Sequence, residues 1–456
     1  MKESLTDKGH KYILFRTDSI NTRLSLMKQS IGNKKIVVIG LGYVGLPLAL
    51  LSSKKGFHTT GVDLNKQKIK LIQEKTSPFN DEEIQKELTT TSLQVSNDFA
   101  AVASADIIIL CVPTPVDNHK MPDYGPVQSA CESIGPYLKK GQCVILESTV
   151  NPGVCEEIVI PTIELVSKLR VGEDISVAHC PERINPGDKK WNVSNIPRVI
   201  GGFDEKSLDL AVEFYHSIID AEIKPMASLK EAEAVKIVEN SFRNINIAFV
   251  NELAKSFARL NIDVVNVING AATKPFAFMP HYPGCGIGGH CIPVDPYYLI
   301  EYAFKNNGFK HDFLALACKT NESMHRYTAD LVRDELAKKG VSIENARVAV
   351  LGLAYKKDID DCRESPSFGI IKYLQEMGAE VVSYDPHVLS KSSVRTLEEA
   401  LTGTDAVVVA TDHAEFSGLS VNDLESFEIK SVIDGRNCLK KEDFLASSIS
   451  YKGVGR

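Results

Sequence analysis

The sequence predicts an α/β protein in which two doubly wound domains are joined by a long central helix and a helical middle domain. Three observations lead to this fold class. A strand, a glycine turn, a helix, a second strand and an acidic residue follow one another over residues 35–63. The same order returns over residues 347–385. Between these two units, residues 228–260 have the apolar periodicity of one continuous helix.

Length and composition agree with several globular domains. At 456 residues the chain is about three times the size of a usual domain. Its 43% hydrophobic and 24% charged residues are ordinary for a folded protein. We expect an N-terminal extension, a nucleotide-binding domain, a helical domain that mediates dimerisation, and a C-terminal nucleotide-binding domain. Their expected bounds are residues 1–33, 34–215, 216–328 and 329–456.

Charge and hydropathy argue against two classes of partner. The net charge of −7 supplies no basic surface for nucleic acid. No apolar run approaches the ~20 residues that span a bilayer. Residues 1–33 lack the apolar core of a secretion signal. The 10 cysteines form no C-x-x-C pair, which is typical of a reducing compartment. We therefore expect a cytoplasmic protein that binds neither nucleic acid nor membranes.

The first unit has the order of a dinucleotide-binding site. The β-branched run of residues 35–40 predicts a buried strand, residues 46–55 a helix, and residues 58–62 a second strand that ends at Asp63. The turn between the first strand and the helix supplies the expected cofactor-binding residues Gly40, Gly42, Tyr43, Val44 and Gly45.

Each glycine of this turn has its own physical reason. Gly40 permits the turn, Gly42 lets the backbone approach a pyrophosphate, and Gly45 lets the helix pack closely. The helix N-terminus offers free N–H groups to the phosphates. Asp63 is expected to accept hydrogen bonds from both ribose hydroxyls. Because a 2′-phosphate would meet this carboxylate, the sequence favours NAD over NADP. The alternative to nucleotide binding is that the glycines serve only a tight turn between the strand and the helix.

Three further strands complete the expected first sheet, at residues 107–112, 144–147 and 175–178. Each ends in polar residues, and α/β sheets bind ligands at that edge. Thr114 follows the first of these strands, and Thr149 follows the second. The third unit, over residues 347–385, repeats the strand and acid order without the full glycine triplet. It predicts a second sheet that binds a nucleotide in a different way.

The central helix carries apolar residues at helical spacing and would be roughly 50 Å long. That length favours a spine that joins two domains and pairs with its copy in a dimer, while a core helix of the middle domain is the alternative. The apolar residues are Val235, Val238, Phe242, Ile245, Phe249, Leu253 and Phe257.

A glycine-rich segment over residues 282–296 supplies the candidate nucleophile. Cys291 stands at the end of a run of glycines that leaves the backbone exposed, and Asp295 follows four residues later, on the same face if the segment turns helical. Most of the other cysteines are typical of small buried residues. Cys285 is a rival nucleophile, but it lacks a carboxylate at that spacing.

Polar residues on the central helix complete the candidate site. Lys236 and Asn240 are i,i+4 neighbours and share a face with Arg243 and Asn244. Such groups usually mark a solvated face, but beside a cysteine and a dinucleotide they can stabilise an oxyanion. A thiol, an oxyanion site and a hydride acceptor together indicate oxidation at the aldehyde level. The 11 histidines show no metal-ligand spacing, so no metal site is expected.

Seven ordered motifs from residue 34 onward resemble the UDP-glucose/GDP-mannose dehydrogenase family. Within that family the central motifs are most similar to UDP-N-acetylhexosamine 6-dehydrogenases. The motifs are GLGYVGLPLA, CVPTP, ESTVNPG, CPERINPGD, AEAVKIVENSFRNINIAFVNELA, YPGCGIGGHCIPVDP and LGLAYKKDIDDCRESPS.

The resemblance implies a four-electron oxidation of C6 of a UDP-sugar, with two NAD+ consumed per sugar. Cys291 would form a thiohemiacetal and then a thioester. Lys236 and Asn240 would stabilise the oxyanions, and Asp295 would act with a water or activate the thiol. Glu182 would be the base for hydrolysis, and Thr149 would hold water or the nicotinamide.

The resemblance also assigns binding residues. Lys68 and Arg363 join the cofactor site, with Arg363 reaching across from the third domain. The implied substrate-binding residues are Glu182, Arg183, Lys236, Asn240, Tyr282, Gly286, Gly288, Tyr355, Lys356 and Arg436.

Two departures from the UDP-glucose pattern favour a 2-acetamido sugar. The second carboxylate expected after Glu182 is replaced by residues 184–187, and an arginine expected before the glycine segment is replaced by residues 273–276. UDP-glucose or GDP-mannose oxidation is the alternative, and a non-catalytic sugar-nucleotide-binding regulator is a remote one. Residues 1–29 match nothing in the family, and one hypothesis is that translation begins at Met27.

Overall fold

The computed structural model describes residues 34–79, 81–117, 121–184 and 190–456. The expected N-terminal extension, with Met27, therefore lies outside the described residues. So do three members of the expected departure from the UDP-glucose pattern, Asn185, Pro186 and Gly187.

The first domain is built on a sheet with strand order β3-β2-β1-β4-β5-β6-β7-β8. All neighbours are parallel except β6 and β7. The order reverses between β1 and β4, and ligands of doubly wound sheets bind at such a point. The strands are β1 (Lys35–Ile39), β2 (His58–Val62), β3 (Gln94–Ser96), β4 (Ile107–Leu110), β5 (Cys143–Leu146), β6 (Ser176–His179), β7 (Arg198–Gly202) and β8 (Ile223–Pro225).

Helices cover both faces of this sheet, because its strands are apolar on both sides. Along β1, Ile36 and Val38 join one core, and Val37 and Ile39 join the other. The α-helices are α2 (Gly45–Lys54), α3 (Lys66–Gln73), α4 (Glu82–Thr90), α5 (Gly125–Ile134), α6 (Ile160–Ser167) and α7 (Glu205–Ile218). Shorter turns are 3₁₀-helices at Phe99–Ser104 and Gly135–Tyr137 and a π-helix at Cys155–Val159.

The third domain has a fully parallel sheet with strand order β10-β9-β11-β12-β13. Its strands are β9 (Arg347–Leu351), β10 (Glu380–Tyr384), β11 (Ala406–Val409), β12 (Ser431–Asp434) and β13 (Ser450–Gly453). Its helices are α12 (Pro366–Glu376), α13 (Leu397–Leu401), α14 (Ala414–Ser417) and α15 (Val421–Ser426), with 3₁₀-helices at Ile343–Asn345 and Lys441–Phe444.

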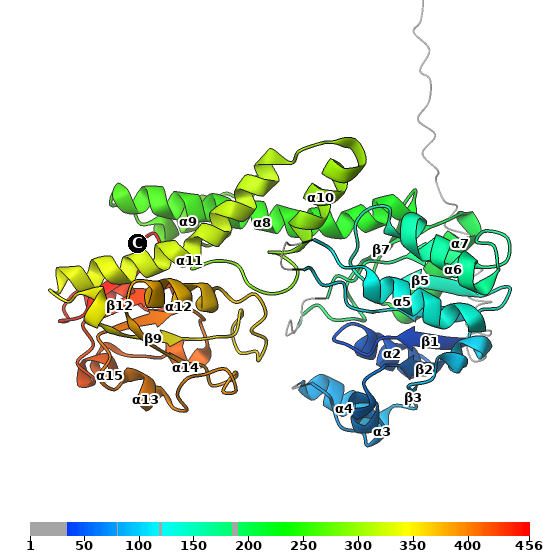
Figure 1. Ribbon diagram of the computed structural model, residues 1–456, viewed down its shortest axis with the longest axis horizontal. Coiled ribbons are helices and arrows are strands. Elements are labelled where there is room, and N and C mark those ends of the chain that lie inside the picture. The colour runs from blue at the N-terminus through cyan, green and yellow to red at the C-terminus, as the bar shows by residue number, and fades with distance from the viewer. Residues whose placement is uncertain (1–33, 80, 118–120, 185–189) are drawn as a thin grey trace, which may run out of the picture.

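Four helices form the middle of the molecule: α8 (Leu229–Arg259), α9 (Val264–Ala272), α10 (Asp295–Asn307) and α11 (Asp312–Lys338). Helix α8 extends over both α/β halves, and α11 lies along it above the third domain (Figure 1). Leu229 at the start of α8 belongs to a core of the first domain, whereas Val250 and Ala254 belong to a core of the third. The predicted fold class, with its long central helix, is confirmed.

On α8, several large apolar side chains are exposed and several polar side chains are buried, which is the reverse of the usual pattern. Val238, Phe242 and Phe249 are 59%, 46% and 56% exposed. Lys236 and Asn240 are buried. The periodicity therefore predicted the helix, but three of the residues that carried the prediction face away from the core.

In the repeated unit of the third domain, the acidic residue Asp385 is hydrogen-bonded within the protein. Asp385, which follows β10 as Asp63 follows β2, is fully buried and accepts hydrogen bonds from the N–H groups of Leu353 (2.6 Å) and Ala354 (2.7 Å). His413 lies 3.0 Å away on the same carboxylate. This acid is therefore closed off from a ribose, which supports the expected difference in nucleotide binding.

None of the helices in the described part of the chain combines the length and the apolar character needed to span a bilayer.

Candidate active site

The glycine turn after β1 leaves one open position. A Cβ atom on Gly40 would lie 2.6 Å from the Cys111 carbonyl oxygen, and one on Gly45 would lie 1.9 Å from the Gly40 oxygen. A Cβ atom on Gly42 would meet nothing within 4 Å. Val44, the N-cap of α2, makes no side-chain capping bond. Leu46 N–H is bonded to the Gly42 carbonyl (3.1 Å) and Pro47 has no N–H, so an anion would be received by the open backbone at Gly42 and by the positive end of the α2 dipole.

Asp63 lies beside this turn and is bonded to its backbone. Its carboxylate accepts hydrogen bonds from the N–H of Leu41 (2.8 Å) and from Lys68 Nζ (2.7 Å), and Asn65 N–H binds the other oxygen. Burial alone would raise the pKa of Asp63, but these hydrogen bonds lower it below its usual value. The carboxylate is therefore ionised, and Lys68 lies directly beside it. The predicted contact of Lys68 with the cofactor stays a prediction.

Tyr43 points to the other side of the turn, where its ring stacks on Phe79 at 4.2 Å between centroids. Burial raises the pKa of Tyr43, Asp360 and Asp361 raise it further, and Arg363 opposes them. The segment around Arg363 in the third domain thus faces the glycine turn of the first. The predicted contact of Arg363 with the cofactor stays a prediction.

The two threonines lie at the ends of neighbouring strands. Thr114 follows β4, and its carbonyl oxygen accepts a hydrogen bond from Tyr298 of α10. Thr149 follows β5 and is half-buried. Between these strands, Ser148 Oγ donates to the Val112 carbonyl at 2.7 Å.

Cys291 is held in the turn that begins α10. Its carbonyl oxygen accepts hydrogen bonds from the N–H groups of Val294 (3.0 Å) and Asp295 (2.8 Å). Burial raises the pKa of the thiol to about 12; Asp295 and Glu182 raise it, while Lys236 and Arg363 oppose them. The thiol is consequently protonated at neutral pH and needs a base before it can attack a carbonyl.

Asp295 lies directly against α8. The side chain is 3% exposed, and its Oδ2 accepts a hydrogen bond from Asn240 Nδ2 at 2.5 Å. Burial raises the pKa of Asp295 to about 7, with Asn240 and Lys236 opposing the shift. A carboxyl group with this pKa can take up or release a proton near neutrality.

Most of the polar face predicted on α8 is buried. Lys236, Asn240 and Asn244 are buried, and Asn244 Nδ2 donates to the Ile292 carbonyl at 3.0 Å. Arg243, which lies about two turns after Lys236 on the same side of the helix, is exposed.

Glu182 approaches the same site from the end of β6. Its N–H binds the Glu147 carbonyl at 3.3 Å, and its carboxylate accepts from the Ile184 N–H. Burial raises the pKa of Glu182 to about 7, and Lys236 and Arg198 oppose the shift. Lys236 therefore acts electrostatically on three of the residues predicted to be catalytic, Glu182, Cys291 and Asp295.

The side chain of Arg183 is hydrogen-bonded to other residues of the protein. Its guanidinium donates to the Pro197 carbonyl (2.9 Å) and to Glu239 Oε1 (2.5 Å) on α8. These bonds fasten the segment after β6 to the central helix. Its predicted contact with substrate stays a prediction.

The glycine segment packs against the third domain. A Cβ atom on Gly288 would lie 2.5 Å from the Cβ of Tyr355, and one on Gly286, where φ is +133°, would lie 2.6 Å from His325. The Gly289 N–H binds the Arg363 carbonyl at 2.9 Å. These glycines therefore permit close packing against neighbouring segments. This packing can explain the glycines in addition to the predicted contact with a ligand.

The other predicted substrate residues lie around this segment. Arg436 Nε donates to the Ala410 carbonyl (2.9 Å), and its Nη2 lies 3.3 Å from the Tyr355 carbonyl. Lys356 is half-buried. Tyr282 is half-exposed, and its hydroxyl donates to Asn269 of α9 at 2.8 Å. Cys285, the rival nucleophile, is fully buried, with its sulfur 3.5 Å from the Ala410 carbonyl.

Two buried groups near these residues were not predicted. Arg198 and Glu147 form a fully buried ion pair at 3.6 Å, and the Tyr215 hydroxyl donates to Glu147 at 2.5 Å. Cys155, His179 and Glu233 converge in the core. Because these residues are far apart in the sequence, no spacing signal connects them.

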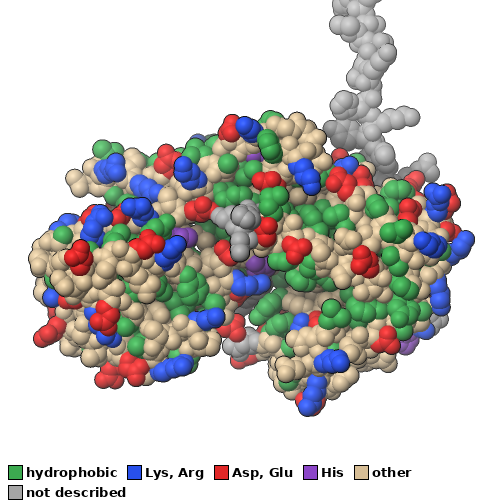
Figure 2. All heavy atoms as spheres, viewed as in Figure 1, with side chains coloured by type: hydrophobic (Ala, Val, Ile, Leu, Met, Phe, Trp, Pro, Cys, Tyr) green, Lys and Arg blue, Asp and Glu red, His purple; other side chains and the backbone are tan. Residues whose placement is uncertain are grey.

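The candidate site lies where the two α/β halves meet. Figure 2 shows the molecular surface hollowed between them, with charged side chains at the rim. A nucleotide-binding turn on one side and a second α/β sheet on the other, with a half-buried thiol between them, define an oxidoreductase with two α/β domains that acts on a nucleotide-linked substrate.

Comparison with known proteins identifies the family. Residues 34–219 match the NAD binding domain of the UDP-glucose/GDP-mannose dehydrogenase family, residues 230–323 match its central domain, and residues 349–441 match its UDP binding domain. The chain belongs to this family.

Several relatives are similar over most of their length. The UDP-N-acetyl-D-glucosamine 6-dehydrogenase of Pseudomonas aeruginosa is 36% identical over 86% of this chain and 93% of its own. The structure of a UDP-D-ManNAc dehydrogenase from Pyrococcus horikoshii has a TM-score of 0.86 and 34% identity, over 92% of this chain and 99% of that one. That of an NDP-N-acetyl-D-galactosaminuronic acid dehydrogenase from Methanosarcina mazei has a TM-score of 0.82 and 32% identity, over 95% and 98%.

The raised pKa of Asp295 predicts a pH-dependent stability. This carboxyl ionises near pH 4 in an unfolded chain, whereas its pKa in the folded protein is about 7. Between these values the folded state binds more protons, so the free energy of unfolding falls as the pH rises through the window. Asp295→Asn keeps an acceptor for Asn240 and should stabilise the protein above pH 7, by on the order of 1–4 kcal/mol, but not near pH 4.

Urea unfolding of both proteins at about pH 5 and about pH 8 measures this difference. Asp209→Asn, an exposed change on α7, is the matched control and should show no such pH dependence. An equal effect of Asp295→Asn at both pH values would contradict the prediction.

Proposed function

We propose that this protein catalyses the NAD-dependent four-electron oxidation of C6 of a UDP-N-acetylhexosamine to the uronic acid, for polysaccharide or glycan biosynthesis. The observation that carries the proposal is the placement of Cys291 beside Asp295, Lys236 and Glu182, between the NAD binding and UDP binding domains. A binding module would have no need of a half-buried thiol among acid–base groups.

The choice of sugar rests on the relatives and on the sequence. The three relatives are named for N-acetyl sugars of the gluco, manno and galacto series, at 32–36% identity. The Thr273 to Phe276 segment also departs from the UDP-glucose pattern. Both observations support a 2-acetamido sugar, and neither selects among the three isomers.

The residues of the glycine turn fit NAD. Gly42 leaves space at the N-terminus of α2. Asp63 offers an ionised carboxylate where a 2′-phosphate would be repelled. Bound there, NAD+ supplies a hydride acceptor for each of the two oxidations. Lys68, Tyr43, Thr114 and Arg363 are proposed to border it.

In the proposed mechanism the alcohol at C6 is oxidised first, and Lys236 and Asn240 stabilise the negative charge on its oxygen. Cys291 then loses its proton, with Asp295 as the base or acting through a water, and its sulfur adds to the aldehyde carbon. The thiohemiacetal oxygen is stabilised by the same ammonium and amide. Loss of a hydride leaves a thioester on Cys291.

Hydrolysis of this thioester completes the reaction. Glu182, with a pKa of about 7, is proposed to remove a proton from the attacking water, and Thr149 to position that water. The C–S bond breaks, the thiol regains its proton and the uronic acid leaves. Arg183, Tyr282, Gly286, Gly288, Tyr355, Lys356 and Arg436 are proposed to bind the UDP-sugar.

Three further features are proposed. The proposed domain bounds at 215/216 and 328/329 fall within α7 and α11, and β8 carries the first sheet on to Pro225. All ten cysteines are free thiols, which supports a reducing, cytoplasmic location. A homodimer through α8 is supported by the exposed Val238, Phe242 and Phe249, which lie at helical spacing and leave apolar surface uncovered.

A panel of nucleotide sugars tests the activity. Purified protein with NAD+ should form two NADH per sugar from at least one of UDP-GlcNAc, UDP-ManNAc and UDP-GalNAc, because two hydrides leave C6. UDP-glucose and GDP-mannose are the comparison substrates. Turnover of UDP-glucose alone would refute the choice of sugar, and binding without NADH formation would favour the regulator.

Cys291→Ser tests the nucleophile. Net turnover should fall by roughly three orders of magnitude or more, since a serine ester is hydrolysed poorly. Mass spectrometry is expected to find a covalent adduct or an aldehyde-level product. Cys285→Ser is the matched control, because its hydroxyl can still donate to Ala410 and its turnover should persist. If Cys291→Ser forms two NADH per sugar at the normal rate, the assignment is wrong.

The double variant Phe242→Glu/Phe249→Glu tests the dimer. It places charges on the exposed face of α8, so light scattering should give about twice the 50.1 kDa of one chain for the wild type and about one chain for the variant. Leu165→Glu, an equally exposed apolar position on α6, is the control and should stay dimeric. A monomeric wild type would contradict the proposal.

A further inference from the structure

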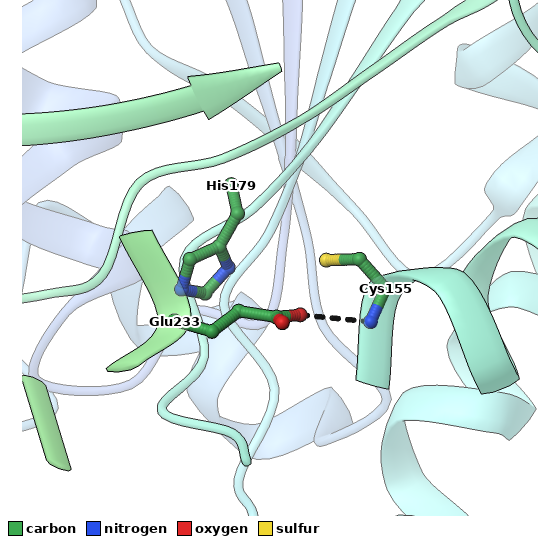
Figure 3. A group of neighbouring side chains, drawn as sticks. All are labelled: Cys155, His179 and Glu233. Carbon is green, nitrogen blue, oxygen red and sulfur yellow. Dashed lines mark hydrogen bonds between the residues drawn. The ribbon is translucent and has the colours of Figure 1, made fainter. Parts of the chain in front are cut away.

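Cys155, His179 and Glu233 form a cluster of three different donor types in the core. Cys155 begins the π-helix before α6, His179 ends β6, and Glu233 lies in the second turn of α8. All three are fully buried, and one donor atom from each lies within 4.8 Å of the other two. Figure 3 shows the imidazole ring, the thiol and the carboxylate turned toward a common centre.

His179 is the unusual member of this cluster. Neither Nδ1 nor Nε2 has a hydrogen-bond partner among the described residues, although the side chain is 0% exposed. A buried polar group without a partner costs about 1–3 kcal/mol. Burial lowers the pKa of His179 to about 3, with the Leu146 backbone opposing the shift. The ring is therefore neutral, which is the form that binds a metal ion.

Glu233 keeps acceptor sites free for a further partner. Its two oxygens accept hydrogen bonds from the N–H groups of Gly153 (2.5 Å) and Cys155 (2.8 Å). A carboxylate has about four lone-pair sites, so each oxygen can make one more contact, and the Cys155 thiol takes up one of these. The two backbone bonds also fix the orientation of the carboxylate, as outer hydrogen bonds do for many metal ligands.

We propose that Cys155, His179 and Glu233 form a Zn²⁺ site that fastens the first domain to the central helix. A thiolate, an imidazole and a carboxylate are the ligand types that zinc takes in proteins. Zinc binding would release the thiol proton of Cys155. One Zn²⁺ with one thiolate, one carboxylate and one neutral imidazole then has no net charge, so the buried centre has no uncompensated ion.

Metal binding would require the donor atoms to approach one another by at most about 1.3 Å. With Zn–S near 2.3 Å and Zn–N and Zn–O near 2.0–2.2 Å, tetrahedral ligand atoms lie about 3.5 Å apart. The donor atoms of the cluster are at most 4.8 Å apart. A water molecule would be the fourth ligand. A nearby carbonyl such as that of Leu146 is the usual acceptor for the second nitrogen of a zinc-bound histidine.

A second cluster of similar composition does not meet these conditions. Asp358, His387 and His413 also approach within 4.8 Å. However, His413 Nδ1 accepts a hydrogen bond from the Asp358 N–H (2.8 Å), and its Nε2 is bonded to Asp385 (3.0 Å). Both ring nitrogens are thus engaged within the protein, and this cluster is structural.

The direct test is the metal content of the full chain. Protein expressed with added zinc and dialysed against metal-free buffer should retain one Zn²⁺ per chain by plasma mass spectrometry. Cys155→Ser and His179→Leu should each lower that content at least tenfold. Cys131→Ser, a change at a neighbouring buried cysteine, is the matched control and should retain zinc.

A measurement on the unmodified chain guards against variants that fail to fold. Chelator-treated, reduced wild type titrated with Co²⁺ should develop thiolate-to-cobalt charge-transfer absorption with one equivalent bound. Added zinc should raise its midpoint of thermal unfolding, because a ligand bound to the folded state stabilises it. Wild type that binds neither ion, or a folded Cys155→Ser variant that retains zinc, would overturn the proposal.

Discussion

The structure depends on one helix that carries polar side chains into the interior. Helix α8 starts in a core of the first domain and ends in a core of the third, so it fixes the distance between two nucleotide-binding sheets. Along its buried face lie Glu233, Lys236, Asn240 and Asn244. Each meets a group from another segment, as Asn240 meets Asp295. Displacing this helix would disturb both domains and the candidate site together.

Burial then sets the chemistry of the groups gathered there. Desolvation is the largest influence on the pKa of Cys291, Asp295 and Glu182, and it favours the neutral form of each. The ammonium group of Lys236 opposes the shift at all three. Two carboxyl groups with pKa values near 7 can thereby exchange protons at neutral pH. In water the two carboxyl groups would be ionised at that pH.

The two repeated units show how one local pattern supports different uses. In the first, Asp63 stays at the edge of the sheet, half-buried beside Lys68. In the third, Asp385 is fully enclosed by backbone N–H groups and His413. The strands and turns are alike, but the neighbouring loops decide whether the acid can face a ligand. The third domain therefore has to bind its nucleotide through other groups.

The sequence alone determined the fold class, the strands and the long helix, because alternation, glycine turns and helical spacing are local properties of the chain. It also marked Cys291, Lys236 and Asn240 through motif and spacing. Only the tertiary structure decided that Lys236, Asn240 and Asn244 are buried while Phe242, Arg243 and Phe249 are exposed. Only it joined Cys155 and His179 to Glu233. Burial and convergence arise from contacts between segments distant in sequence, and no local pattern records them.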